Sequence, residues 1–161
     1  MSERNIGRRG FLTSAGLGLS AVGLTGWAVD AAEMTDEEKR NVKVLQDFLT
    51  ARWTVPFNAE GIGKYLAQDC IRGADDIRVR GRQAILDELT TNYKDTESAD
   101  FKILQTWARG PLLMNERIEH TKVRGRSSGA SGGEWHGMGF FVLKDGLIKE
   151  WRTFTFRAGQ Q

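Results

Sequence analysis

The chain has 161 residues, of which 40% are hydrophobic and 27% are charged, and its formal net charge is +2. This length and balance suit a single globular domain, and the small net charge argues against a nucleic-acid-binding protein. A single cysteine, Cys70, excludes an internal disulfide, and the two histidines, His120 and His136, are too few for the usual zinc site. No phosphate-binding glycine motif and no membrane-spanning stretch is found, so we expect neither a cofactor nor a membrane partner.

Residues 1–32 have the pattern of an export signal. Arg8-Arg9 precede Gly-Phe-Leu, a mildly apolar run rich in glycine follows over 14–29, and the segment ends on small residues. This order resembles a twin-arginine signal. An amphipathic N-terminal helix is the alternative, but its charged and apolar residues would be interleaved instead of separated. We therefore expect a periplasmic or secreted protein whose single domain spans 33–161.

Helices are predicted in the first half of that domain. Thr35 and Glu38 have the spacing of a capping box, so a helix is expected from about Asp36 to Trp53, before Pro56. A second helical stretch is expected over 59–67.

A short strand and turn are expected next, over 69–79, and a third helix over 82–93. Strands are predicted in the second half, where the apolar period changes to two. They cover Phe101 to Trp107, then 112–124, 135–144 and 147–157.

Two turn signals separate the later strands. A Gly/Ser-rich loop over 127–133 precedes the strand at 135–144, and a tight turn at Asp145-Gly146 follows it. Helices followed by an antiparallel meander predict an α+β fold with segregated layers.

Four short motifs carry a specific resemblance. Tyr-Leu-Ala-Gln-Asp at 65–69 and Gly-Arg-Gln-Ala-Ile at 81–85 resemble the nuclear transport factor two-like (SnoaL-like) superfamily. Asn-Glu-Arg-Ile-Glu at 115–119 and Asp-Gly-Leu-Ile-Lys-Glu-Trp-Arg at 145–152 resemble its limonene-1,2-epoxide hydrolase branch. The resemblance implies a cone-shaped curved antiparallel sheet wrapped by about three helices, a deep apolar pocket and a homodimer.

Arg117 and Glu119 are the predicted catalytic pair. On a strand they leave the same face, as do Leu113, Asn115 and Thr121. On a solvated face the pair would contribute little to the stability of the protein. If the face lines a pocket, the pair would instead mark a functional site. The resemblance favours the pocket, because that branch has an arginine and an acid two residues apart.

In that branch a second acid, two residues after the tryptophan of the last strand, activates a water together with a tyrosine and an asparagine. Here Thr153 stands at the acid, and Arg72 and Ala74 stand at the tyrosine and asparagine positions. A threonine is no general base near neutral pH, so epoxide hydrolysis is expected to be absent or very slow. Asp75 is a candidate substitute, although an Asp-Asp pair is also typical of a solvated turn.

The remaining pocket residues follow from strand faces and the resemblance: Asn115, Trp135, Gly137 and Trp151 join Arg72, Asp75 and Thr153. Trp135 and Phe141 would form aromatic walls, with glycines leaving room between them. The opposite face of that strand carries His136, Met138, Phe140 and Val142. It is also largely apolar, which predicts dimerisation through the outer side, with His136 and His120 outside the catalytic site.

Three functions remain open on the sequence. The first is an exported, cofactor-free enzyme performing isomerisation, dehydration or ring opening on a small lipophilic molecule, with Glu119 oriented by Arg117. The second is a non-catalytic protein that binds such a ligand, and the third is an interaction module whose pocket is filled. The retained pair favours the enzyme, and the missing water-activating acid favours the binding protein.

Overall fold

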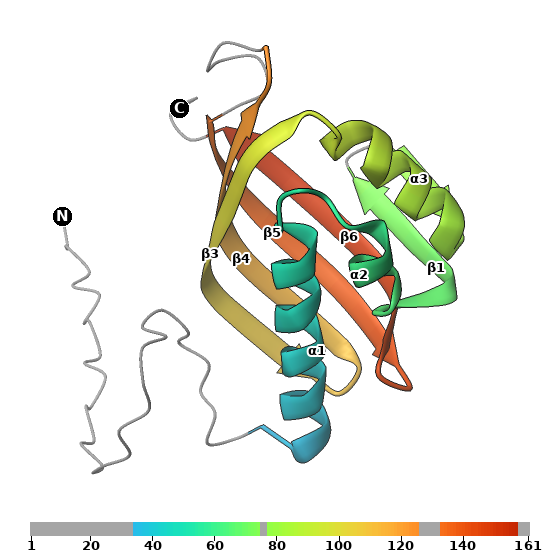
Figure 1. The fold of residues 1–161 in the computed structure, drawn as a ribbon. Helices are drawn as coiled ribbons and strands as arrows, with labels where there is room; N and C mark the ends of the chain where they lie inside the picture. Colours follow the sequence, from blue (N-terminus) through green and yellow to red (C-terminus); the bar gives the residue numbers. More distant parts are fainter. Residues whose placement is uncertain (1–33, 75–76, 126–132, 158–161) are drawn as a thin grey trace, which may run out of the picture.

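The computed structural model describes residues 34–74, 77–125 and 133–157 (Figure 1). The predicted export signal, Asp75 and nearly all of the predicted Gly/Ser-rich loop lie outside these residues. The helices are α1 (Asp36–Arg52), α2 (Ala59–Gly63) and α3 (Arg82–Tyr93). The strands are β1 (Leu66–Ala74), β2 (Ile77–Arg80), β3 (Thr96–Arg109), β4 (Leu112–Val123), β5 (Gly133–Lys144) and β6 (Leu147–Arg157). None of the described helices is long and apolar enough to cross a membrane.

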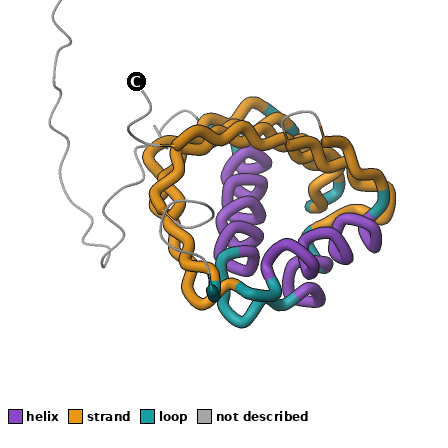
Figure 2. The backbone as a smooth tube through the Cα atoms, turned by 90° about the horizontal axis from the view of Figure 1, so that it is seen from above, coloured by secondary structure: helices purple, strands orange, loops and turns teal. Residues whose placement is uncertain are grey.

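The six strands form one curved sheet in the order β2-β1-β6-β5-β4-β3. Strands β3 to β6 are an antiparallel meander, as predicted, and β1 adds to β6 in parallel. The sheet bends around α1, and helices close the side that the strands leave open (Figure 2). The predicted α+β architecture is confirmed, except that the sheet is mixed and not purely antiparallel.

Helix α1 begins with the predicted capping box. The Thr35 hydroxyl accepts from the backbone N–H of Glu38 at 3.2 Å, and the Glu38 carboxylate accepts from the backbone N–H of Thr35 at 2.8 Å. The other oxygen of Glu38 accepts from the backbone N–H of Gly110 at 2.8 Å. These backbone donors, Gly110 first, lower the pKa of Glu38. Glu38 therefore joins the start of the helix to the β3–β4 turn.

The second helix is shorter than predicted. It ends at Gly63, and Leu66 and Ala67 begin β1, where Leu66 pairs with Ile148 of β6. Gly61 and Gly63 weaken this helix, since glycine loses more conformational freedom in a helix than other residues do. The β5–β6 turn matches its prediction: Asp145 and Gly146 have φ of 53° and 72°, as a two-residue hairpin turn requires.

The hydrophobic core fills the part of the concave side where β4 begins and β5 ends. Phe48 of α1 lies edge-on to Trp151, with 5.1 Å between ring centroids, and to Phe141, at 6.1 Å. Trp151 and Phe141 are stacked at 6.4 Å. All three are essentially buried, and each large side chain contributes roughly 2–3 kcal/mol by leaving water. This packing leaves the opposite end of the concave side for a cavity.

Candidate active site

Arg117 and Glu119 of β4 form a buried ion pair on the concave face. Arg117 is 0% exposed and Glu119 is 6% exposed. Nε of Arg117 donates to Oε1 of Glu119 at 2.5 Å, and Nη1 donates to Oδ1 of Asn115 at 3.2 Å. The strand alternation that predicted a shared face is confirmed. Of the two interpretations of the pair, the solvated one is wrong.

Two glycines of β5 make room for this guanidinium. Gly137 pairs with Arg117 and Gly139 with Asn115 across the β4–β5 ladder. A Cβ atom at Gly137 would lie 3.4 Å from Cζ of Arg117, and one at Gly139 would lie 2.9 Å from Nη1 of Arg117. The glycines were expected to leave room for a ligand; instead the arginine occupies that room.

Arg117 is a buried cation that fixes the position of Glu119. Burial lowers the pKa of the Arg117 guanidinium, the carboxylate of Glu119 opposes this, and the nearby cation of Arg52 lowers that pKa further. Arginine nevertheless stays protonated in proteins, so Arg117 is a permanent cation. A short charge-assisted hydrogen bond to a fixed cation holds one oxygen of Glu119 in place.

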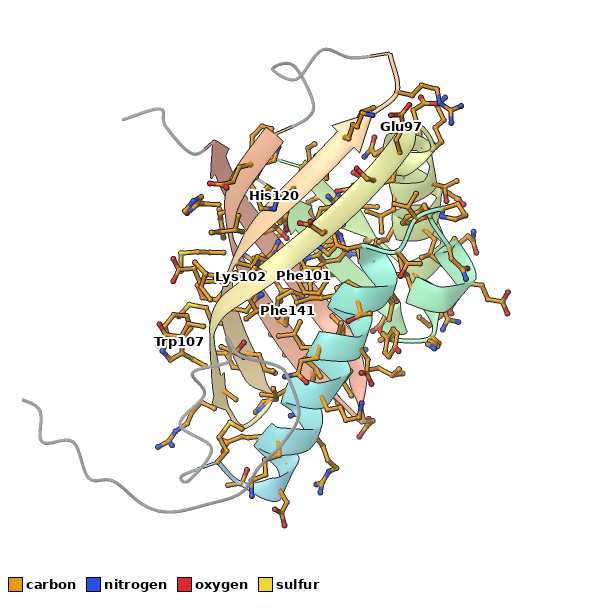
Figure 3. The ribbon with its side chains drawn as sticks, turned by 60° about the vertical axis from the view of Figure 1, so that its left-hand side comes forward. Glu97, Phe101, Lys102, Trp107, His120 and Phe141 are labelled. Carbon is orange, nitrogen blue, oxygen red and sulfur yellow. The ribbon has the colours of Figure 1, made fainter. Side chains whose placement is uncertain are left out.

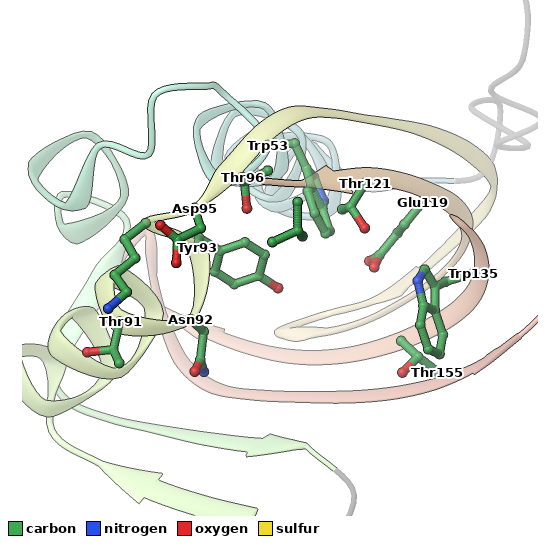
Figure 4. Close-up of a pocket in the computed structure, with 12 residues that line it drawn as sticks. Trp53, Thr91, Asn92, Tyr93, Asp95, Thr96, Glu119, Thr121, Trp135 and Thr155 are labelled. Atoms are coloured by element: carbon green, nitrogen blue, oxygen red, sulfur yellow. The ribbon is translucent and has the colours of Figure 1, made fainter. Parts of the chain in front are cut away.

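A cavity of about 630 Å³ opens at the end of the sheet next to Glu119. The lining side chains come from the end of α1, the end of α3 and the strands of the meander: Trp53, Thr91, Asn92, Tyr93, Lys94, Asp95, Thr96, Glu119, Thr121, Val123, Trp135 and Thr155. Glu119 and Tyr93 both point into this space (Figure 4). Its size is that of a small-molecule site.

Of the predicted pocket residues, only Trp135 lines this cavity beside Glu119. Asn115 and Gly137 lie behind the cavity, packed on Arg117. Asp75 lies outside the described residues. The sequence pattern assigns these side chains to the concave face but does not show how deep along the strand each lies.

Arg72, Trp151 and Thr153 form a separate buried cluster. Nη1 of Arg72 contacts both carboxylate oxygens of Glu88 at 2.6 and 2.7 Å, and its guanidinium lies 5.1 Å from the Trp151 ring centroid. The indole N–H of Trp151 donates to the Thr153 hydroxyl at 2.7 Å. None of the three lines the cavity beside Glu119, and Thr153 instead borders a smaller hollow of about 220 Å³ with Gly73 and Arg152, so their place in a ligand pocket stays a prediction. They are held by one another and by Glu88.

Trp53, Tyr93 and Arg52 were not predicted. Trp53 and Tyr93 line the cavity, and Nη2 of Arg52 donates to the Tyr93 hydroxyl at 2.6 Å. A charged residue followed by tryptophan at the end of a helix was the available signal. The sequence could not show that the ends of α1 and α3 meet.

The histidines lie away from the pair, as expected. His120 is on the outer face, where its ring nitrogens contact Asp100 at 2.8 Å and Glu134 at 3.0 Å (Figure 3). These carboxylates, Glu134 first, raise the pKa of His120. Cys70 is buried, as expected for a small hydrophobic residue, and burial raises the pKa of its thiol to about 12. No cluster of three or more His, Cys, Asp or Glu in the described part of the chain could hold a metal ion.

No protein-family model and no curated protein matches this chain. Solved structures do. An M. tuberculosis epoxide hydrolase that is LEH-like is 20% identical, with a TM-score of 0.62 over 74% of this chain and 85% of that one. A Jannaschia sp. protein classed as a SnoaL-like polyketide cyclase is 13% identical, with a TM-score of 0.66 over 76% of this chain and 90% of that one. This is the nuclear transport factor two-like fold.

A third structure extends the range of chemistry associated with the nuclear transport factor two-like fold. A Kribbella flavida protein classed as a ketosteroid isomerase is 15% identical, with a TM-score of 0.61 over 78% of this chain and 84% of that one. At such identities the likeness establishes the fold alone. Because one fold hosts many reactions, the reaction that this protein could catalyse depends on Glu119 and its surroundings.

Proposed function

We propose that the protein is an exported enzyme that acts on a small lipophilic molecule by acid/base chemistry without a cofactor. Glu119 transfers the proton, and Arg117 positions Glu119. The observation that carries this proposal is that the Glu119 carboxylate reaches the cavity while a fully buried Arg117 holds one of its oxygens.

The second oxygen of Glu119 has no hydrogen-bond partner among the described residues, and the side chain keeps 8% of its surface exposed, toward the cavity. A carboxylate held in this way can take a proton from a substrate carbon or give one to a leaving oxygen. Trp53 and Trp135 supply aromatic surface for a lipophilic substrate.

Among the described residues, Glu119 is the one buried acid that lines the cavity, and this favours proton transfer over hydrolysis. The other acid at the cavity, Asp95, is exposed at its rim, and Thr153 is buried beside Trp151. Isomerisation and dehydration need one group that moves a proton. Hydrolysis of an epoxide needs in addition a base that activates water. We therefore favour isomerisation or dehydration.

The proposal is tested with a Δ5-3-ketosteroid and limonene-1,2-epoxide as probes, because similar solved structures are named as a ketosteroid isomerase and an epoxide hydrolase. Glu119→Gln should lower any turnover by about 100-fold or more. Glu116→Gln is the matched control, since Glu116 is on the same strand and faces outward. Turnover by Glu119→Gln at the wild-type rate would contradict the assignment.

A ligand-binding protein without catalysis is the second candidate. It is favoured by the absence of a second buried carboxylate at the cavity in the described residues. The two candidates differ in whether the bound molecule is chemically changed. Quenching of the fluorescence of Trp53 and Trp135 by a probe that is recovered unchanged would favour the binding protein.

Export is tested separately. The proposal rests on the pattern of residues 1–32, which lie outside the described part of the chain. Replacing Arg8 and Arg9 by lysine should leave the precursor in the cytoplasm, because the twin-arginine route reads that pair. Unchanged export of this variant would overturn the proposal.

A further inference from the structure

A second buried cation lies beside the cavity. Arg52, the last residue of α1, is 5% exposed. Its guanidinium lies 4.2 Å from the Trp53 ring centroid, 5.1 Å from that of Tyr93 and 5.2 Å from that of Trp151. Nε and Nη1 of Arg52 are buried and have no hydrogen-bond partner among the described residues. A buried donor without a partner is costly, and more so on a charged group.

The charges in this region do not balance. Among the described residues Arg117 is paired with Glu119, and the third buried arginine, Arg72, is paired with Glu88. No carboxylate in the described ranges contacts Arg52, whose only side-chain hydrogen bond there is to Tyr93. One positive charge is therefore left over in a place where water does not screen it, and a negative charge nearby would be strongly favoured.

Tyr93 connects this cation to the cavity. Its hydroxyl oxygen accepts the hydrogen bond from Arg52, and no described residue accepts the proton of that hydroxyl. A tyrosine hydroxyl has one proton to donate, so this donor remains available to a ligand. The ring is fixed, edge-on to Trp53 at 5.8 Å and stacked on Phe57 at 5.9 Å. The hydroxyl points into the cavity (Figure 4).

We propose that Tyr93, supported by Arg52, binds a negatively charged oxygen of the ligand, so that the cavity takes a small aromatic or alicyclic acid in its ionised form. The inference rests on the proposed function only in using the same cavity. The acid would balance the charge of Arg52, while the rest of the ligand would lie between Trp53 and Trp135, within reach of Glu119.

The test compares 1-naphthoate with its neutral isostere 1-naphthamide at pH 7, by tryptophan fluorescence and calorimetry. The wild type should bind the carboxylate about tenfold or more tightly than the amide, because hydrogen bonds to charged groups are the stronger ones. Tyr93→Phe should lower this ratio clearly, because it removes the hydroxyl that donates to the charged oxygen, although the cation of Arg52 stays. Tyr65→Phe is the matched control: Tyr65 is the other tyrosine of the chain and does not line the cavity.

Equal affinity for the two probes, absence of naphthoate binding at millimolar concentration, or an unchanged ratio in Tyr93→Phe would each overturn the inference. Tyr93→Phe keeps the ring and its packing, so it is expected to fold. Arg52→Met is a second variant, and it should lower naphthoate affinity without affecting the amide.

Glu119→Gln separates this inference from the proposed function. The variant should keep the preference for the carboxylate while losing turnover. Turnover that depends on Glu119, without a preference for the acid, would refute the inference alone. A preference for the acid, with turnover that does not depend on Glu119, would refute the catalytic proposal alone.

Discussion

A Cβ atom at Gly139 would lie 2.6 Å from Oδ1 of Asn115, its partner across the β4–β5 ladder. The same atom would lie 2.6 Å from the Phe141 ring and 2.9 Å from Nη1 of Arg117. Real Cβ atoms do not approach other atoms this closely. The absence of a side chain at Gly139 is therefore a condition for the buried arrangement of Asn115 and Arg117.

Gly139→Ala should destabilise the protein by roughly 2–3 kcal/mol, because overpacking forces neighbours out of place. Gly137→Ala is the matched control on the same strand. Its Cβ would find its nearest neighbour, in Arg117, at 3.4 Å. It should cost less than about 1 kcal/mol, since restricting the unfolded chain offsets part of the crowding. Urea unfolding of both variants measures the difference, and equal stabilities would contradict the packing described.

Arg117 and Glu119 should be strongly coupled. Glu119→Gln leaves a buried cation without its counter-charge and should cost about 3 kcal/mol of unfolding free energy. Arg117→Met should also destabilise, and the double variant should recover part of the loss. A double-mutant cycle by denaturant unfolding measures the coupling.

The exposed pair of Lys43 and Asp47, 2.9 Å apart on α1, is the control for that cycle. Its coupling should be about 0.3–0.5 kcal/mol. If the coupling of Arg117 and Glu119 were no larger, the pair would have no special role in the site.

Epoxide hydrolysis should be absent or slow. The Thr153 hydroxyl is 2.7 Å from Nε1 of Trp151, and Thr153 does not line the cavity that Glu119 reaches. Turnover of limonene-1,2-epoxide is expected to stay far below about 1 per second, a modest rate for an enzyme. Thr153→Asp should not raise it, because position 153 does not line the cavity that Glu119 reaches. Diol formation followed by gas chromatography provides the measurement, and a rate of about 1 per second or more would show that water is activated at this cavity without an acid at Thr153.

Dimerisation through the outer face remains a prediction. Phe140 and Phe154 are 37% and 47% exposed there, edge-to-face with 6.3 Å between ring centroids, and Trp107 on the same face is 38% exposed. Exposed apolar groups of this size favour a closed two-fold interface. Sedimentation should give about twice the mass of one chain, and Phe140→Asp should give monomers.

Val55→Asp is the control for the dimer experiment, because Val55 is also 37% exposed but lies in the loop after α1. It should leave the sedimentation unchanged. A wild-type monomer at micromolar concentration would contradict the interface.

Glu38 should make stability depend on pH. Hydrogen bonds from the backbone of Gly110 and Thr35 lower the pKa of this carboxyl below the ordinary value of a glutamate. Its contribution is therefore fully present above the unfolded pKa and is lost as the pH falls through the lower, folded value. Glu38→Gln should lower the melting temperature at neutral pH. It should change the melting temperature little in strong acid, where the carboxyl of Glu38 is protonated and is as uncharged as the amide that replaces it. Glu37→Gln, at an exposed neighbour in the same helical turn, is the control, and identical behaviour of the two variants would refute the cap.

Local features of the fold could be read from the residues alone. The capping box placed the start of α1, the Asp145-Gly146 turn placed the β5–β6 hairpin, and the alternation along β4 assigned Arg117 and Glu119 to one face. These features depend on neighbours a few residues apart, and helix caps, tight turns and strand alternation have sequence signatures at that range.

Which concave residues reach the cavity was settled by long-range packing. The folded chain brings Trp53 and Tyr93 from two helix ends to Glu119, fills the space at Gly139 with Asn115 and Arg117, and leaves Thr153 outside the cavity. The alternation along a strand determines on which face of the sheet a side chain lies. It does not determine how far along the concave side that residue lies. The place of a residue along the concave side depends on how the sheet bends around α1 and on where the helices end. Both the bend and the helix ends follow from contacts between residues far apart in the chain.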